Sequence, residues 1–187
     1  MLVDFEHISQ RVASHTPVRI IDSSSRYACV LVALVQHKNV LHLLLTKRTD
    51  RVEHHKGQIS FPGGVVDEGD ESPQHTALRE LQEELGIPPS SVSIIGQLDD
   101  FHIPTGFIVT PFVGFIDHSI DVHTRNDEVD EILLIPFEKF FDPTLRRLET
   151  RFLKGAERQV YFYDVWKEPV WGATAHIIKQ FTDLLAQ

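Results

Sequence analysis

Apolar residues recur at helical spacing near both ends of the chain. Leu2, Phe5, Ile8 and Val12 lie three or four positions apart before Pro17, which is the spacing of one face of an amphipathic helix. The pattern predicts an N-terminal flanking helix over residues 1–16 and a C-terminal helix over residues 173–187. The apolar positions of the second helix are Ala175, Ile178, Phe181, Leu184 and Leu185.

Between these ends, short apolar runs bounded by turn residues predict buried strands. Residues 27–35 and 40–46 flank the turn-like segment QHKN and predict a hairpin. Further strands are expected over residues 92–98, 107–116 and 158–166, and an apolar run at 132–137 follows an acidic segment at 125–131. No repeat, low-complexity stretch or linker composition divides the chain, so we expect one domain over residues 1–187.

A third helix is predicted between a cap at Glu71 or Ser72 and a stop at Gly86, because Ala77, Leu81 and Leu85 form an apolar stripe. The chain before it, from residue 47 to 64, is polar and contains HHKGQISFPGG. Its glycine and proline content favours a shaped loop over a regular element. Loops of this kind commonly carry functional sites.

Three carboxylates crowd one face of this central helix. Glu80, Glu83 and Glu84 lie in the segment RELQEELG, and positions i, i+3 and i+4 share a helix face, so these charges repel one another. A solvated acidic surface would explain them, but it needs no glycine-rich loop beside it. Because Mg²⁺ prefers oxygen ligands shared between a few carboxylates and substrate phosphates, a cation site is the sharper interpretation.

The composition limits the kinds of molecule that the protein is expected to bind and the compartment in which it is expected to work. The formal net charge of −9 disfavours binding to nucleic acid or to anionic membranes, and a polyanionic small substrate would need metal ions. The single Cys29 cannot form an internal disulfide and lies in an apolar run, which is typical of a reducing compartment. Neither a signal peptide nor a run of membrane-spanning length is evident, so we expect a cytoplasmic protein.

Residues 63–87, GGVVDEGDESPQHTALRELQEELGI, resemble the Nudix box. Its pattern is Gly, five residues, Glu, seven residues, then Arg-Glu-apolar-x-Glu-Glu-x-Gly-apolar. One departure leaves two candidates for the acid in the loop. Glu71 has the expected spacing from Arg79 but stands one residue too far from Gly64. Asp70 has the expected spacing from Gly64 but stands one residue too far from Arg79.

The resemblance extends beyond the box. The segments LLLTKRTDRVEHHKGQISFPGGVVDEGD and PTGFIVTPFVGF, which lie within residues 43–116, are similar to the coenzyme A pyrophosphatase branch of the Nudix family. This resemblance implies an α/β Nudix fold, an α/β/α sandwich with a central mixed sheet. It also implies Mg²⁺ or Mn²⁺ as cofactor and attack of water on a diphosphate. With coenzyme A, the products would be 3′,5′-adenosine bisphosphate and 4′-phosphopantetheine.

Matched to the family pattern position by position, the box residues receive roles. Glu83 and Glu84 match glutamates that bind metal, and Glu80 matches the glutamate that binds metal or helps to activate water. Gly63 or Gly64 is expected to offer a carbonyl to the metal. Arg79 matches the arginine that orients a glutamate through charge-assisted hydrogen bonds.

Candidates outside the box rest on weaker patterns. Many Nudix enzymes use a further glutamate on a later loop as ligand or base, and Glu128 and Glu131 are the available choices. A solvated loop is the simpler explanation for each. Substrate contacts are expected from Arg48, His55, Lys56, Gly63 and Phe107, although a polar surface loop or core packing would account for several of these.

Two other functions stay open at the level of sequence. One is a Nudix hydrolase that acts on ADP-ribose, a dinucleotide or a nucleoside triphosphate, because substrate pockets are built from loops outside the box. The other is a catalytically silent nucleotide-binding module, which the intact glutamates disfavour. A homodimer is possible, with the terminal helices either covering the core or forming the interface.

Overall fold

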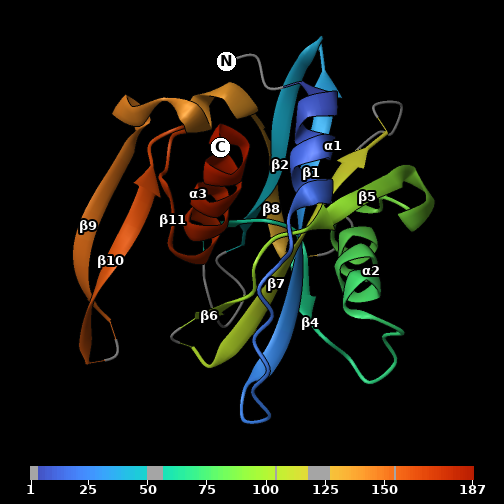
Figure 1. Cartoon of the computed structure of the whole chain (residues 1–187), viewed down its shortest axis with the longest axis horizontal. Coiled ribbons are helices and arrows are strands. Elements are labelled where there is room, and N and C mark those ends of the chain that lie inside the picture. The colour runs from blue at the N-terminus through green and yellow to red at the C-terminus, as the bar shows by residue number, and fades with distance from the viewer. Residues whose placement is uncertain (1–3, 50–56, 104, 118–126, 154) are drawn as a thin grey trace.

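A mixed eight-stranded sheet forms the centre of the chain in this computed structural model, which describes residues 4–49, 57–103, 105–117, 127–153 and 155–187 (Figure 1). The strands are β1 (Arg26–His37), β2 (Val40–Arg48), β3 (Ile59–Ser60), β4 (Gly63–Val65), β5 (Val92–Gln97), β6 (Phe101–Ile103), β7 (Phe107–Ile116) and β8 (Val129–Pro136). The predicted loop before the central helix therefore contains two short strands, β3 and β4.

The sheet has the order β3-β2-β1-β7-β5, with β4 paired to β1, β6 to β7 and β8 to β2. Strands β1 and β7 run parallel, and the other pairs are antiparallel. This confirms the mixed sheet expected from the sequence. The two central strands are apolar on both sides, as expected for strands covered on both faces.

Three helices cover the two faces of the sheet. α2 (Pro73–Leu85) packs on one face, where Leu81 and Leu85 join the alternate β1 residues Leu31 and Ala33. α1 (Phe5–Ser14) and α3 (Gly172–Ala186) belong to the apolar cluster of the opposite face. This arrangement confirms the α/β/α sandwich.

The terminal helices pack against each other. The Arg11 side chain donates hydrogen bonds to the carbonyl of Leu184, at 3.1 Å, and Ile8 and Val12 of α1 are buried. These two helices therefore cover the core. No helix in the described part of the chain is long and apolar enough to span a membrane.

A second, three-stranded sheet lies beside α3 and contains β9 (Arg146–Leu153), β10 (Ala156–Tyr163) and β11 (Val170–Trp171). The sequence predicted a strand at β10 but none at β9. Short 3₁₀ helices occupy Pro89–Ser91, Phe137–Phe141 and Pro143–Leu145.

Candidate active site

The helix α2 is fixed at its start by local capping. The Ser72 side chain accepts a hydrogen bond from the backbone N–H of His75, and Pro73 occupies the first turn, both as the sequence predicted. The apolar stripe of the helix is anchored in the sheet. The side chains of Arg79, Glu80, Glu83 and Glu84 are therefore carried by a rigid element.

Two adjacent glycines bring the backbone of β4 against this helix. Gly63 and Gly64 pair with Val30 and Cys29 of β1. A Cβ atom built on Gly64 would lie only 2.3 Å from Oε1 of Glu80. The carboxylate of Glu80 therefore rests directly on the main chain at Gly64, a contact that a larger residue would prevent.

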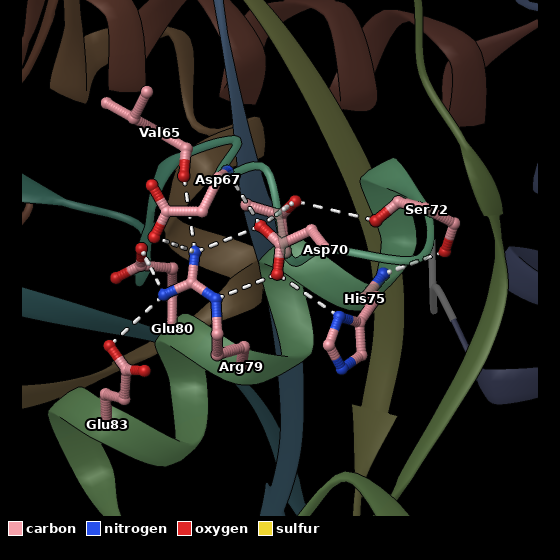
Figure 2. Close-up of polar contacts among 9 residues, drawn as sticks. Val65, Asp67, Asp70, Ser72, His75, Arg79, Glu80 and Glu83 are labelled. Carbon is pink, nitrogen blue, oxygen red and sulfur yellow. Dashed lines mark hydrogen bonds and ion pairs between the residues drawn. The ribbon is translucent and has the colours of Figure 1, made fainter.

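Arg79 is the hub of the polar contacts on this face (Figure 2). Its Nε and Nη2 atoms donate to the two carboxylate oxygens of Asp70 at 2.9 and 3.1 Å. Its Nη1 lies 2.9 Å from Glu80 and 3.2 Å from Glu83, and Nη2 also donates to the carbonyl of Val65. The guanidinium thus ties the box loop to the two glutamates.

Asp70, rather than Glu71, is the loop acid that holds Arg79. The Asp70 side chain is 1% exposed, and it also accepts hydrogen bonds from the Thr76 hydroxyl and the backbone N–H of Asp67. These contacts, with Arg79 foremost, hold the pKa of Asp70 well below its usual range. Asp70 was not among the site residues chosen from the sequence, although its spacing from Gly64 was the available signal.

Replacing Asp70 with asparagine should lower the free energy of unfolding by about 2–4 kcal/mol, because it leaves Arg79 without its bidentate partner. Chemical denaturation near neutral pH measures this loss. Glu71→Gln is the matched control, because Glu71 is exposed, and it should change stability by less than about 0.5 kcal/mol. Equal effects of the two variants would contradict the role assigned to Asp70.

Glu84 is the most deeply buried of the three box glutamates. It is 5% exposed, and burial, as the main cause, raises its pKa to about 8. The backbone N–H of Gly63 donates to its carboxylate, and the charges of Arg48, Glu80 and Glu128 act on it. Within the described ranges, its Oε2 atom is buried without a hydrogen-bond partner.

The two later glutamates are placed differently. Glu128 lies 2.9 Å from Arg48 through its Oε2 atom and is close enough to influence Glu84. Glu131 pairs with Lys47 across β2 and β8. Its neighbour Ile132 packs on the α2 side of the sheet, so Glu131 points to the opposite face. The structure brings Glu128 to the box carboxylates and places Glu131 away from them.

Of the other predicted substrate contacts, Gly63 donates its backbone N–H to Glu84, whereas Phe107 lies at the start of β7. The centre of the Phe107 ring lies 4.9 Å from the guanidinium carbon of Arg26. Phe107 pairs with Arg26 of β1, and Arg26 stands four positions before Val30, the residue that pairs with Gly63. His55 and Lys56 lie outside the described residues. A cavity of about 410 Å³ beside the box loop is lined by residues that include Arg26 and Asp67 but none of the candidate metal ligands.

The NUDIX domain family model matches residues 25–167, well over half of the chain. The chain belongs to the Nudix family. The resemblance found in residues 63–87 is thereby confirmed.

Several relatives agree with this membership. The protein named "Uncharacterized Nudix hydrolase NudL" from Photorhabdus laumondii is 36% identical over 96% of this chain and 95% of its own length. The mouse "Peroxisomal coenzyme A diphosphatase NUDT7" is 32% identical over 88% of this chain and 68% of its own length. A crystal structure of a NUDIX hydrolase from Alicyclobacillus acidocaldarius shares the fold, with a TM-score of 0.57 and 18% identity over 89% of this chain and 94% of that chain.

The Nudix box residues fit a hard divalent cation. The buried Oε2 of Glu84, which has no partner among the described residues, is an oxygen ligand available to a cation, and Glu80 faces the main chain of Gly64 beside it. In the described part of the chain, no three acidic, histidine or cysteine side chains stand close enough to hold an ion as they are. Three of the candidate carboxylates, Glu80, Glu83 and Glu128, are instead paired with arginines.

The raised pKa of Glu84 predicts a pH-dependent stability. The folded carboxyl has a pKa of about 8, against 4.5 in an unperturbed chain. Between these values the folded state holds a proton that the unfolded state has lost, so the metal-free protein loses stability as pH rises. We expect a loss of about 1–3 kcal/mol between about pH 5 and about pH 8 from this group.

Divalent cations bind the carboxylate form, so stabilisation by Mg²⁺ should grow over the same window. Melting temperatures with Mg²⁺ and with a chelator, recorded at several pH values, measure both effects. Carboxyls with a lowered pKa, such as Asp70 and Asp22, lose their contribution only at more acidic pH. A stabilisation by Mg²⁺ that does not change between about pH 5 and about pH 8 would contradict the assignment to Glu84.

Proposed function

We propose that this Nudix protein is a pyrophosphohydrolase that uses Mg²⁺ or Mn²⁺ and cleaves coenzyme A at its diphosphate. The products are 3′,5′-adenosine bisphosphate and 4′-phosphopantetheine. The observation that carries the hydrolytic site is the pair of carboxylates, Glu80 and Glu84, set against the main chain at Gly63 and Gly64. One buried oxygen of Glu84 has no partner in the part of the chain that the structure describes.

The choice of coenzyme A has separate support. The similarity of residues 43–116 to the coenzyme A pyrophosphatase branch includes the run FPGGVVDEGD, from which Gly64 and Asp70 come. The mouse relative with coenzyme A diphosphatase in its name aligns over 88% of this chain. The reducing compartment indicated by the lone Cys29 is consistent with a cytoplasmic enzyme.

Glu80, Glu83, Glu84 and the carbonyl of Gly64 would hold the cations. When bound, these cations neutralise the diphosphate, polarise phosphorus and lower the pKa of water. This supply of positive charge is needed because the box face is acidic and the chain carries a net charge of −9.

Arg79 and Asp70 act as positioning residues. Arg79 holds Glu80 and Glu83 through Nη1, and Asp70 fixes the opposite edge of the same guanidinium. Their contribution is to hold the carboxylates in a single geometry before substrate arrives.

Glu128 is the stronger candidate for a base outside the box. It is partly exposed beside Arg48 and lies near Glu84, whereas Glu131 faces the other side of the sheet. We expect Glu128→Gln to lower kcat more than Glu131→Gln does. Arg48, a predicted substrate contact, joins Glu128 to this group.

Product analysis by mass spectrometry tests the proposal. The protein is incubated with coenzyme A and Mg²⁺ or Mn²⁺, and with ADP-ribose in parallel. We expect 4′-phosphopantetheine and 3′,5′-adenosine bisphosphate, and loss of both products with a chelator. Cleavage of ADP-ribose alone would reject coenzyme A and keep the hydrolytic site, whereas tight binding without hydrolysis would indicate a silent module.

A further inference from the structure

The strand β9 is an unprotected edge of the second sheet. Among the described residues it pairs only with β10, and Figure 1 shows it as the outermost strand on its side of the molecule. Leu148 is 51% exposed and Phe152 is 74% exposed on this strand. Such an edge is a template for pairing with another strand unless proline, bulges or charged side chains prevent it. β9 contains no proline, and its charged residues, Arg146, Arg147, Glu149 and Arg151, include both signs.

The hydrogen-bonding groups of β9 divide between its two sides. Leu153 pairs with Ala156 across two intervening residues, and the pair that closes such a hairpin is hydrogen-bonded. Because bonded pairs alternate along an antiparallel ladder, the odd-numbered residues of β9 bond to β10. The main-chain groups of Leu148, Thr150 and Phe152 therefore point to the open edge.

The side chains of β9 are self-complementary about Thr150. In an antiparallel pairing of two copies with Thr150 opposite Thr150, Leu148 faces Phe152 of the second copy, and Phe152 faces Leu148. Glu149 then faces Arg151 of the second copy, and Arg151 faces Glu149. This register also joins the even-numbered residues of both strands, whose main-chain groups are open.

We propose that two copies of this chain associate through β9, with a two-fold axis at Thr150, so that the two small sheets join into one. The dimer contains two apolar pairs, Leu148 with Phe152, and two opposite-charge pairs, Glu149 with Arg151. Cross-strand pairs of both kinds stabilise a ladder. The dimer is isologous, since the same strand serves both partners. This inference is independent of the reaction that the Nudix site catalyses.

The charges of β9 favour this partner over an unrelated strand. Glu149 forms ion pairs with Arg147 and Arg151 of its own strand, and Arg147 and Arg151 also lie over the ring of Phe162. The acidic and basic positions are thus on one face of the sheet, already close together. Because an edge pairing buries less than a standard interface, the dimer should dissociate on dilution.

The test is a charge-reversal series followed by sedimentation velocity at protein concentrations up to about 100 μM, a range that detects weak association. We expect the unmodified chain to dimerise, and Glu149→Arg and Arg151→Glu each to be monomeric, because each places like charges opposite one another. Mixing the two variants should restore a dimer, since two arginines on the strand of one copy then face two glutamates on the strand of the other. Native mass spectrometry identifies the mixed dimer by its mass.

Two further variants make the outcome decisive. Thr150→Pro removes an outward N–H, which an edge strand tolerates, and a hydroxyl that accepts a hydrogen bond from the exposed Gln159 side chain. It should abolish the dimer while the melting temperature at low concentration stays close to that of the unmodified chain. Glu6→Arg is an exposed reversal on α1 and should leave the dimer unchanged. An unmodified chain that stays monomeric, a dimer that survives these β9 changes, or variants that fail to combine would overturn the proposal.

Discussion

Replacing Glu84 with glutamine should lower the turnover of the Nudix reaction by about two to four orders of magnitude, equal to about 3–5 kcal/mol of transition-state stabilisation. Glutamine keeps the shape of the side chain but removes the negative charge that holds a divalent cation. The change should act mainly on kcat, because the cations neutralise charge at the reacting phosphorus. Steady-state kinetics with coenzyme A and Mg²⁺ measure the effect.

The same substitution should make the metal-free protein more stable. Glu84 is 5% exposed, its Oε2 has no partner in the described part of the chain, and its pKa is raised to about 8 by burial. Removing a carboxylate whose charged form is disfavoured should raise the free energy of unfolding by about 1–3 kcal/mol at alkaline pH. Lower turnover together with higher stability is the result expected for a residue that serves function at a cost in folding stability.

Glu68→Gln is the matched control, because Glu68 is an exposed glutamate of the Nudix box, in the loop that precedes α2. It should change neither turnover nor the response to Mg²⁺. Full turnover in Glu84→Gln would remove this residue from the cation site, and a loss of stability would contradict the burial argument.

The parts of the fold that follow from local pattern could be predicted. The strands β1, β2, β5 and β7 are apolar runs, and α2 has a cap, a first-turn proline and an apolar stripe. The strand β9 could not, because charged side chains in RRLETRFL alternate with others on an exposed edge. Burial, on which the prediction of strands depends, is absent there. β8 likewise begins at Val129, inside a segment that the sequence marked only as acidic.

In the candidate site too, local sequence predicts the placement of some residues, and strand pairing decides the placement of others. Arg79, Glu80 and Gly64 lie together in the structure, because Arg79 and Glu80 are on α2 and Gly64 is on β4, the element that precedes α2 in the chain. Whether Glu128 or Glu131 faces the box depends on the pairing of β2 with β8, which shifts register between Lys47 and Arg48. A one-residue shift exchanges the faces of a strand, and no local pattern in the sequence specifies it.

Gly64→Ala should lower turnover by about 10²-fold without unfolding the protein. The new Cβ would lie 2.3 to 2.8 Å from the carboxylate atoms of Glu80, so that carboxylate must move. It is the far end of a flexible side chain, and its displacement should cost about 1 kcal/mol or less in stability. A displacement of about 1 Å of a catalytic group can cost about 10²-fold in rate.

The neighbouring glycines supply the controls that separate folding from catalysis. A Cβ on Gly63 would lie 2.3 Å from the carbonyl oxygen of Cys29 and 2.6 Å from the Cα of Val30, at a φ of +152°, so Gly63→Ala should destabilise the sheet itself. A Cβ on Gly69 would meet nothing within 4 Å, so Gly69→Ala should match the unmodified enzyme. Melting temperatures and kcat for the three variants therefore form a series: loss of stability, loss of rate alone, and no change. If Gly64→Ala kept full activity, the contact of the Glu80 carboxylate with the main chain at Gly64 would not be needed for catalysis. The cation site would then have to be assigned to Glu83 and Glu84 without Glu80.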